Sequence, residues 1–149
     1  MDIATDHLVA RILLTLNTLG FSLGPAIADF SRTHATNPLW TPHARFHVVW
    51  QVLSYCGIGL IALGLIWIGG PTATMRLWLA WALALAVYLG FFATVFSMPL
   101  YGGKVADVNG IPPITTMQIA GRAVGLDVNV TVFCVQIAVL ILAGLAITW

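Results

Sequence analysis

The chain contains no glutamate and few charges of either sign: only five of its 149 residues are acidic and six are lysine or arginine. A water-soluble domain carries charge on about a quarter of its residues, because charge covers its surface. Here 7% of the residues are charged and 60% are hydrophobic. This composition excludes an ordinary soluble domain and is typical of an integral membrane protein. The net charge of +1 provides no basic patch for nucleic acid, so we expect no nucleic-acid partner.

Several catalytic and cofactor motifs are also missing from the sequence. It contains no CxxC, CxxCH, P-loop or HExxH motif, so covalent haem attachment and nucleotide hydrolysis have no support. The two cysteines, Cys56 and Cys134, both lie inside apolar runs. We interpret them as packed free thiols rather than as a disulfide or metal ligands.

Four long apolar runs are what the sequence does have. Each is close to the roughly 20 residues that a helix needs to cross the hydrocarbon core, and lipid cannot satisfy the backbone of an irregular segment. We therefore predict an all-α integral membrane protein, with one domain over residues 1–149 and a four-helix transmembrane bundle. The predicted helices cover residues 8–28, 43–69, 75–98 and 129–149.

The connections between these runs are unequal in length. Residues 29–42 and 99–128 form long loops, whereas residues 69–74 form a tight turn, so alternate crossings place both long loops on one face. Four of the six basic residues lie on that side, and the positive-inside rule then favours the cytoplasm for the long loops. In the second long loop, Asn109-Gly110 predicts a hairpin turn, and residues 115–125 are expected to form a short interfacial helix.

Polar chemistry is concentrated in one stretch, THATNPLWTPHARFHVVWQ, residues 33–51, which holds three of the four histidines. Thr41 fits a helix N-cap and Pro42 the first helical position. At roughly 100° per residue, several side chains of the following helix share one side, with Arg45 opposite. We call these residues the polar stripe: His43, His47, Trp50, Gln51 and Ser54. Polar groups avoid lipid, so we predict that the stripe faces the other helices.

The loop before this helix is expected to complete a binding site. Asp29 ends the first helix, and the two prolines Pro38 and Pro42 hold the residues before them extended, which stiffens the loop. A stiff loop can hold side chains at fixed positions over the helix mouth. The candidate ligand-binding residues are Asp29, Arg32, His34, Asn37, Trp40, Arg45, Trp50, Gln51 and Ser54.

The same stretch resembles the signature of a family of small four-helix membrane proteins from bacteria and fungi, which reads Thr-His, Asn-Pro, Trp and Pro-His-Ala-(Arg/Lys)-Phe-His. The matching positions are His34, Asn37, Pro38, Trp40, Pro42, His43, Ala44, Arg45, Phe46 and His47. The resemblance covers only this stretch. It implies the four-helix architecture and assigns no activity.

Two kinds of site are compatible with this cluster. The first is a metal centre built by His34, His43 and His47, with Asp29 or water completing the shell, and such a set would suit zinc, copper or iron. The second grips the polar end of a lipophilic molecule whose tail lies along an aromatic stripe of the third helix. That stripe comprises Trp78, Trp81, Leu85, Tyr88 and Phe92, and it equally fits a seam within the bundle. A histidine, or Asp29 with a histidine, would then serve as acid or base in a lipid-modifying enzyme.

A third function is not catalytic. The small size and the glycines at packing intervals, Gly20 with Gly24 and Gly57 with Gly64, fit an accessory or assembly subunit of a larger membrane complex, or a homo-oligomer. The polar stretch would then be a docking surface or a structural hydrogen-bond network. A transporter or channel is disfavoured, because Asp29 is the only carboxylate near the central crossings.

Overall fold

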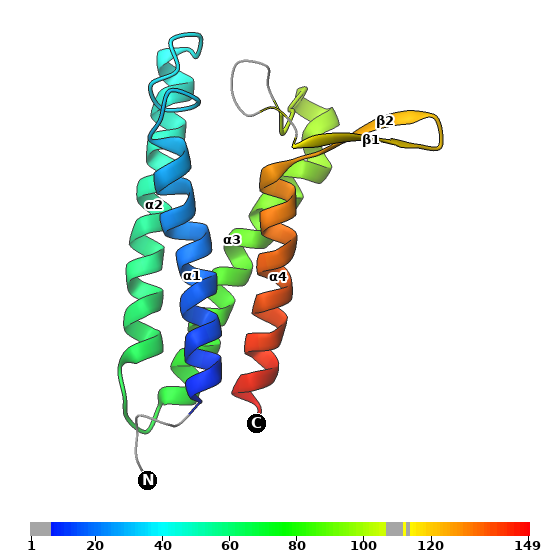
Figure 1. The fold of residues 1–149 in the computed structure, drawn as a ribbon. Helices are drawn as coiled ribbons and strands as arrows, with labels where there is room; N and C mark the ends of the chain where they lie inside the picture. The colour runs from blue at the N-terminus through cyan, green and yellow to red at the C-terminus, as the bar shows by residue number, and fades with distance from the viewer. Residues whose placement is uncertain (1–6, 107–111, 113) are drawn as a thin grey trace.

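The computed structural model of the protein describes residues 7–106, 112 and 114–149. It is predominantly helical, with four long helices and one β-hairpin (Figure 1). In chain order the elements are α1 (Leu8–Asp29), α2 (Pro42–Trp67), α3 (Ala73–Tyr101), β1 (Thr115–Ile119), β2 (Arg122–Leu126) and α4 (Val128–Ile147). By length and composition, each of these four helices is long and apolar enough to cross a membrane. This confirms the prediction of a helical protein with four candidate membrane spans, as a multi-pass membrane protein requires.

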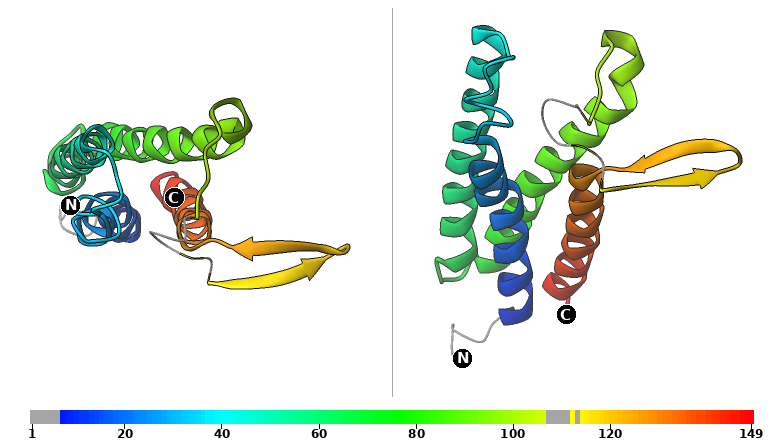
Figure 2. Two further views of the ribbon diagram at one scale, coloured as in Figure 1. Left: turned by 90° about the horizontal axis from the view of Figure 1, so that it is seen from above. Right: turned by 45° about the horizontal axis from the view of Figure 1, so that its top comes forward.

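The helices run alternately up and down, and they diverge toward one end of the bundle. α1 packs against α2 and α4, and α3 packs against the same two helices and more lightly against α1. α3 is strongly tilted, so its first turns lie beside α2 whereas its last turns stand away from α2 (Figure 2). The α1–α2 connection and the hairpin both lie at this divergent end, which we call the loop end (Figure 1).

The helix boundaries follow from local capping. The Thr41 hydroxyl accepts a hydrogen bond from the Ala44 amide at 3.2 Å, with Pro42 in the first turn, as the sequence predicted. The buried Asp127 carboxylate accepts one from the Val130 amide at 3.0 Å and so begins α4. Gly102 ends α3 in the left-handed region, with φ of 70°, where glycine carries no steric penalty.

Close packing between helices uses some of the expected glycines and not others. Gly20 abuts the Gln136 side chain, but a Cβ on Gly24 or Gly57 would meet nothing within 4 Å. Gly59, which the spacing argument missed, lies directly against Ser22 of α1. The predicted Gly57–Gly64 packing face is therefore wrong, because the buried side of α2 runs through Gly59 instead.

A buried hydrogen-bond network joins three helices in the middle of the bundle. The Asn17 amide donates to the Gln136 carbonyl at 2.7 Å and to its side-chain Oε1 at 3.0 Å. The Tyr88 hydroxyl donates to the Asn17 carbonyl at 2.9 Å, and both of these side chains are fully buried. Because lipid offers no alternative partner, such bonds stabilise helix association in a membrane.

The segment at 115–125 corrects one prediction. It is an antiparallel hairpin rather than an interfacial helix, with Ile119 paired to Arg122 across a two-residue turn. The turn residues Ala120 and Gly121 both have positive φ, 49° and 76°, which matches the twist that a tight hairpin requires. The turn predicted at Asn109-Gly110 lies outside the described residues.

Candidate functional site

A cavity of about 560 Å³ opens between the helices toward the loop end. All four helices and the α1–α2 loop contribute to its lining, and we call it the cleft. Its size falls in the range of roughly 300–1,000 Å³ that is usual for small-molecule sites. At this end the helices diverge, and α3 tilts away from α2 (Figures 1 and 2).

The cleft is polar at its mouth and apolar at its floor. Asp29 is the last residue of α1, His34 and Trp40 lie in the loop, and Asn129 is in the first turn of α4, so these lining residues are at the mouth. Phe91 and Phe133 also line the cleft and lie further along their helices. Their rings stack with centroids 4.0 Å apart. The polar end of an amphiphilic ligand would lie at the mouth, and its apolar end would lie at the floor.

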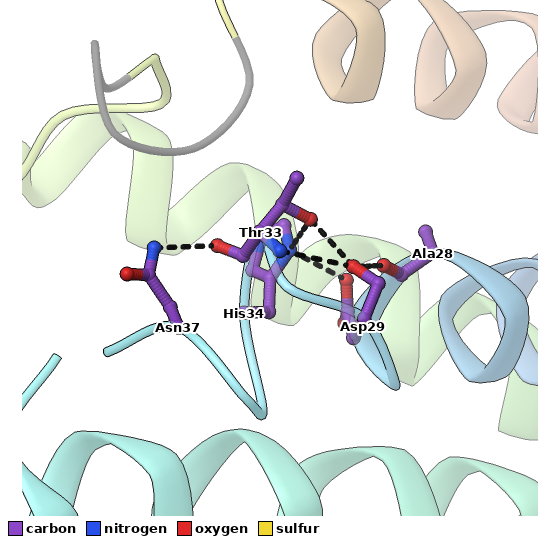
Figure 3. Close-up of polar contacts among 6 residues, drawn as sticks. Ala28, Asp29, Thr33, His34 and Asn37 are labelled. Atoms are coloured by element: carbon purple, nitrogen blue, oxygen red, sulfur yellow. Dashed lines mark hydrogen bonds and ion pairs between the residues drawn. The ribbon is translucent and has the colours of Figure 1, made fainter. Parts of the chain in front are cut away.

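The His34 ring is held in place by its neighbours (Figure 3). Its Nδ1 lies 2.8 Å from the Thr33 hydroxyl and 3.6 Å from a carboxylate oxygen of Asp29. The ring packs edge-on against Trp40 with centroids 5.2 Å apart. The His34 and Asp29 side chains are only 18% and 16% exposed. A carboxylate beside an oriented imidazole can stabilise the charge that forms when the ring takes up a proton.

Asn37 does not line the cleft, although the sequence placed it among the ligand-binding residues. It is 2% exposed, and its Oδ1 accepts a hydrogen bond from the Leu39 amide at 3.0 Å. Its Nδ2 donates to the Thr33 carbonyl at 3.2 Å (Figure 3). A short amide side chain often satisfies backbone groups in turns in this way. Asn37 therefore fixes the loop that carries His34.

The polar stripe of α2 divides into two parts. All five side chains are exposed, but only His47 and Gln51 line the cleft, and His43, Trp50 and Ser54 lie outside its lining. The residues of this region that face the core are Val48 and Val52. The prediction that the whole stripe faces the other helices is thus wrong, because the first turns of α2 stand beside an open cleft rather than a packed neighbour.

The three histidines do not form one ligand set. His43 and His47 lie one turn apart with their Nε2 atoms 3.0 Å from each other, while His34 is engaged with Thr33 and Asp29. Within residues 7–106, 112 and 114–149, no group of three or more His, Cys, Asp or Glu side chains could hold a metal ion. The expected His34, His43 and His47 centre is therefore not assembled.

Other candidate residues also lie outside the cleft, and some lining residues were missed. Arg32 is exposed and Arg45 is half-buried, and neither lines the cavity. In the aromatic stripe of α3, Tyr88 is buried in the core, and Trp81, Leu85 and Phe92 pack against the core. Trp78 is exposed, so the rest of the stripe is a seam of the bundle. Phe91 lines the cleft instead.

Tyr55 and Asn129 line the cleft and were not among the predicted residues. For Tyr55 a signal was present, since it follows His47 and Gln51 at intervals of four residues, which keeps a side chain on one helix face. Comparisons of the chain with protein-family models, with curated proteins and with solved structures found no match.

Proposed function

We propose that the cleft binds the polar end of a lipophilic molecule, with the apolar part of that molecule lying between the helices. One observation carries the proposal: a single cavity joins the Asp29–His34 pair, His47 and Gln51 to an aromatic floor. Ligand sites are mostly apolar with a few placed polar groups. When polar side chains of a membrane helix face a cavity, they commonly mark a functional site.

The direction of the cleft supports this class of ligand. Its polar mouth is at the loop end and its floor points into the apolar part of the bundle, so a headgroup would stay near water while its chain entered hydrocarbon. Within this proposal, both long connections share one side of the membrane, and the excess of basic residues there favours the cytoplasm.

His34 is the residue best placed for acid–base chemistry on such a ligand. Its Nδ1 faces Thr33 and Asp29, and its Nε2 makes no hydrogen bond within the described part of the chain. An imidazole whose orientation is fixed by a carboxylate is a common proton donor and acceptor. A lipid-modifying reaction at this site would therefore act through His34, with Asp29 as its positioning partner.

The proposal is tested with leucine variants of the α2 residues. The full chain is purified in a mild detergent, and the lipids that remain bound are extracted and identified by mass spectrometry. We expect His47→Leu and Gln51→Leu to lose most of the bound lipophile. Ser54→Leu is the control, because Ser54 is an exposed polar residue of the same helix that lies outside the cleft. Equal retention in all three variants, each with unchanged thermal unfolding, would contradict the proposal.

A second candidate is an accessory subunit of a membrane complex. It is favoured by an exposed aromatic surface on the outer side of α2, where the Phe46 ring lies 6.2 Å from Trp50 and 6.4 Å from His43. This surface fits a helix of another chain or a second copy. Loss of a co-purifying chain in His43→Leu, with bound lipophile unchanged throughout, would favour this candidate.

Elemental analysis of the purified variants tests whether the protein binds a metal ion instead. The close pair His43 and His47 supplies two imidazoles at most, and zinc, copper or iron would require further ligands from water or another chain. A bound metal that disappears in both His43→Leu and His47→Leu would support that site over the lipophile.

A further inference from the structure

The β-hairpin leaves the bundle at the point where α4 begins. Only Asp127 separates the last residue of β2 from the first residue of α4, and α4 has the highest hydropathy of the four candidate spans. The root of the hairpin therefore lies at the boundary of the membrane-spanning region. From there the hairpin extends sideways, across the direction of the helices (Figure 1), and every residue from 114 to 126 is exposed.

The pairing register gives the hairpin two unlike faces. Met117 pairs with Val124 and Thr115 with Leu126, while Ile119 pairs with Arg122 next to the turn. Because side chains alternate across a strand, these residues share one face, which we call the apolar face. The opposite face carries the pairs Thr116–Gly125 and Gln118–Ala123, and it is small and polar. The large apolar side chains are 43–54% exposed.

The plane of the two-stranded sheet lies across the bundle axis rather than along it. Its two strands nearly overlap when the bundle is viewed from the side and lie next to each other when it is viewed from above (Figures 1 and 2). One face of the hairpin is therefore turned along the helices toward the membrane, and the other is turned away from it.

From these observations we infer that the hairpin is an interfacial anchor, whose apolar face rests on the acyl-chain boundary of the bilayer that the bundle crosses. A two-stranded hairpin alone is at best marginally stable in water, and burial of one face in lipid supplies the missing partner. At the interface the unpaired strand edges still reach water, which the hydrocarbon core would not provide. Arg122, near the tip, is long enough to reach a lipid phosphate.

The test measures the depth of single positions in vesicles. In a full-length chain carrying Cys56→Ala and Cys134→Ala, spin labels are attached to Met117→Cys, Gln118→Cys, Ala123→Cys or Val124→Cys. The chains are reconstituted in phosphatidylcholine vesicles with and without phosphatidylglycerol. Accessibility is compared between dissolved oxygen, which concentrates in lipid, and a water-soluble nickel chelate. We expect the oxygen-to-nickel ratio at positions 117 and 124 to be several-fold higher than at positions 118 and 123.

Two outcomes would overturn the inference. Equal, water-like accessibility at all four positions would show that the hairpin stands in solution. Protection at 117 and 124 that disappears when the protein-to-lipid ratio is lowered would show that a second copy covers the face. Gln118→Cys and Ala123→Cys, on the same strands, serve as controls for folding, since their labels should show restricted motion if the hairpin is intact.

Discussion

Neighbouring residues of the polar stretch differ in whether their side chains reach the cleft. His43 and His47 are one turn apart on α2, yet only His47 lines the cavity. Asn37 and His34 show the same contrast in the loop: His34 faces the cleft with Asp29 beside it, whereas Asn37 is buried and holds backbone groups. Residue type alone does not separate a ligand-binding side chain from one that supports it.

Replacing Asn37 is predicted to loosen the loop that carries His34. Asn37→Ala removes the hydrogen-bond partner of the Leu39 amide and that of the Thr33 carbonyl. Leaving buried backbone groups unpaired lowers the stability of the fold by about 1–3 kcal/mol. We expect faster hydrogen exchange at the amides of residues 31–40 and weaker lipophile retention. Thr36→Ala, at an exposed position of the same loop, should change neither. Unchanged exchange in Asn37→Ala would show that the loop is held by other contacts.

At the scale of elements, the sequence determined the helices far better than their arrangement. The four apolar runs predicted helix ends within three residues of those observed, because length and hydropathy alone identify a span. Thr41 with Pro42 marked the start of α2. The hairpin was missed even though Thr-Thr-Met-Gln-Ile alternates in polarity, a pattern of period two that favours a strand. The tilt of α3 has no local signal, since it arises from contacts among all four helices.

The contact between α1 and α2 gives a prediction at this scale. Gly59→Leu places a side chain against Ser22 of α1, and overpacking of this kind typically destabilises by about 1–3 kcal/mol. We expect a lower midpoint of thermal unfolding, measured by helical circular dichroism in detergent. Gly57→Leu is the control on the same helix, because a side chain there meets open space. Equal midpoints for both variants would mean that Gly59 does not set the helix separation.

At the scale of the whole molecule, the outer surface of the bundle fits a lipid environment. Large apolar side chains such as Leu60 and Leu100 are 73% and 88% exposed, which a soluble monomer rarely tolerates over a broad surface. Polar side chains lie near both ends of the bundle, as His34 and Arg76 do, or are hydrogen-bonded inside it, as Asn17 is with Gln136. The exposed apolar surface therefore fits a bundle surrounded by lipid.

The central claim is that the cleft holds a lipophilic ligand, and filling the cleft tests it most directly. Gly24 lines the cavity and has open space around it, so Gly24→Trp should occupy the site without displacing a helix. Gly57→Trp, which also meets open space but lies outside the cleft lining, is the matched control. Native mass spectrometry of the detergent-purified chains then counts bound lipid per protein. We predict that Gly24→Trp lowers the occupancy by at least about tenfold, equivalent to roughly 1.4 kcal/mol of binding free energy, while Gly57→Trp matches the wild type. Equal occupancy in the two variants, both folded, would contradict the account.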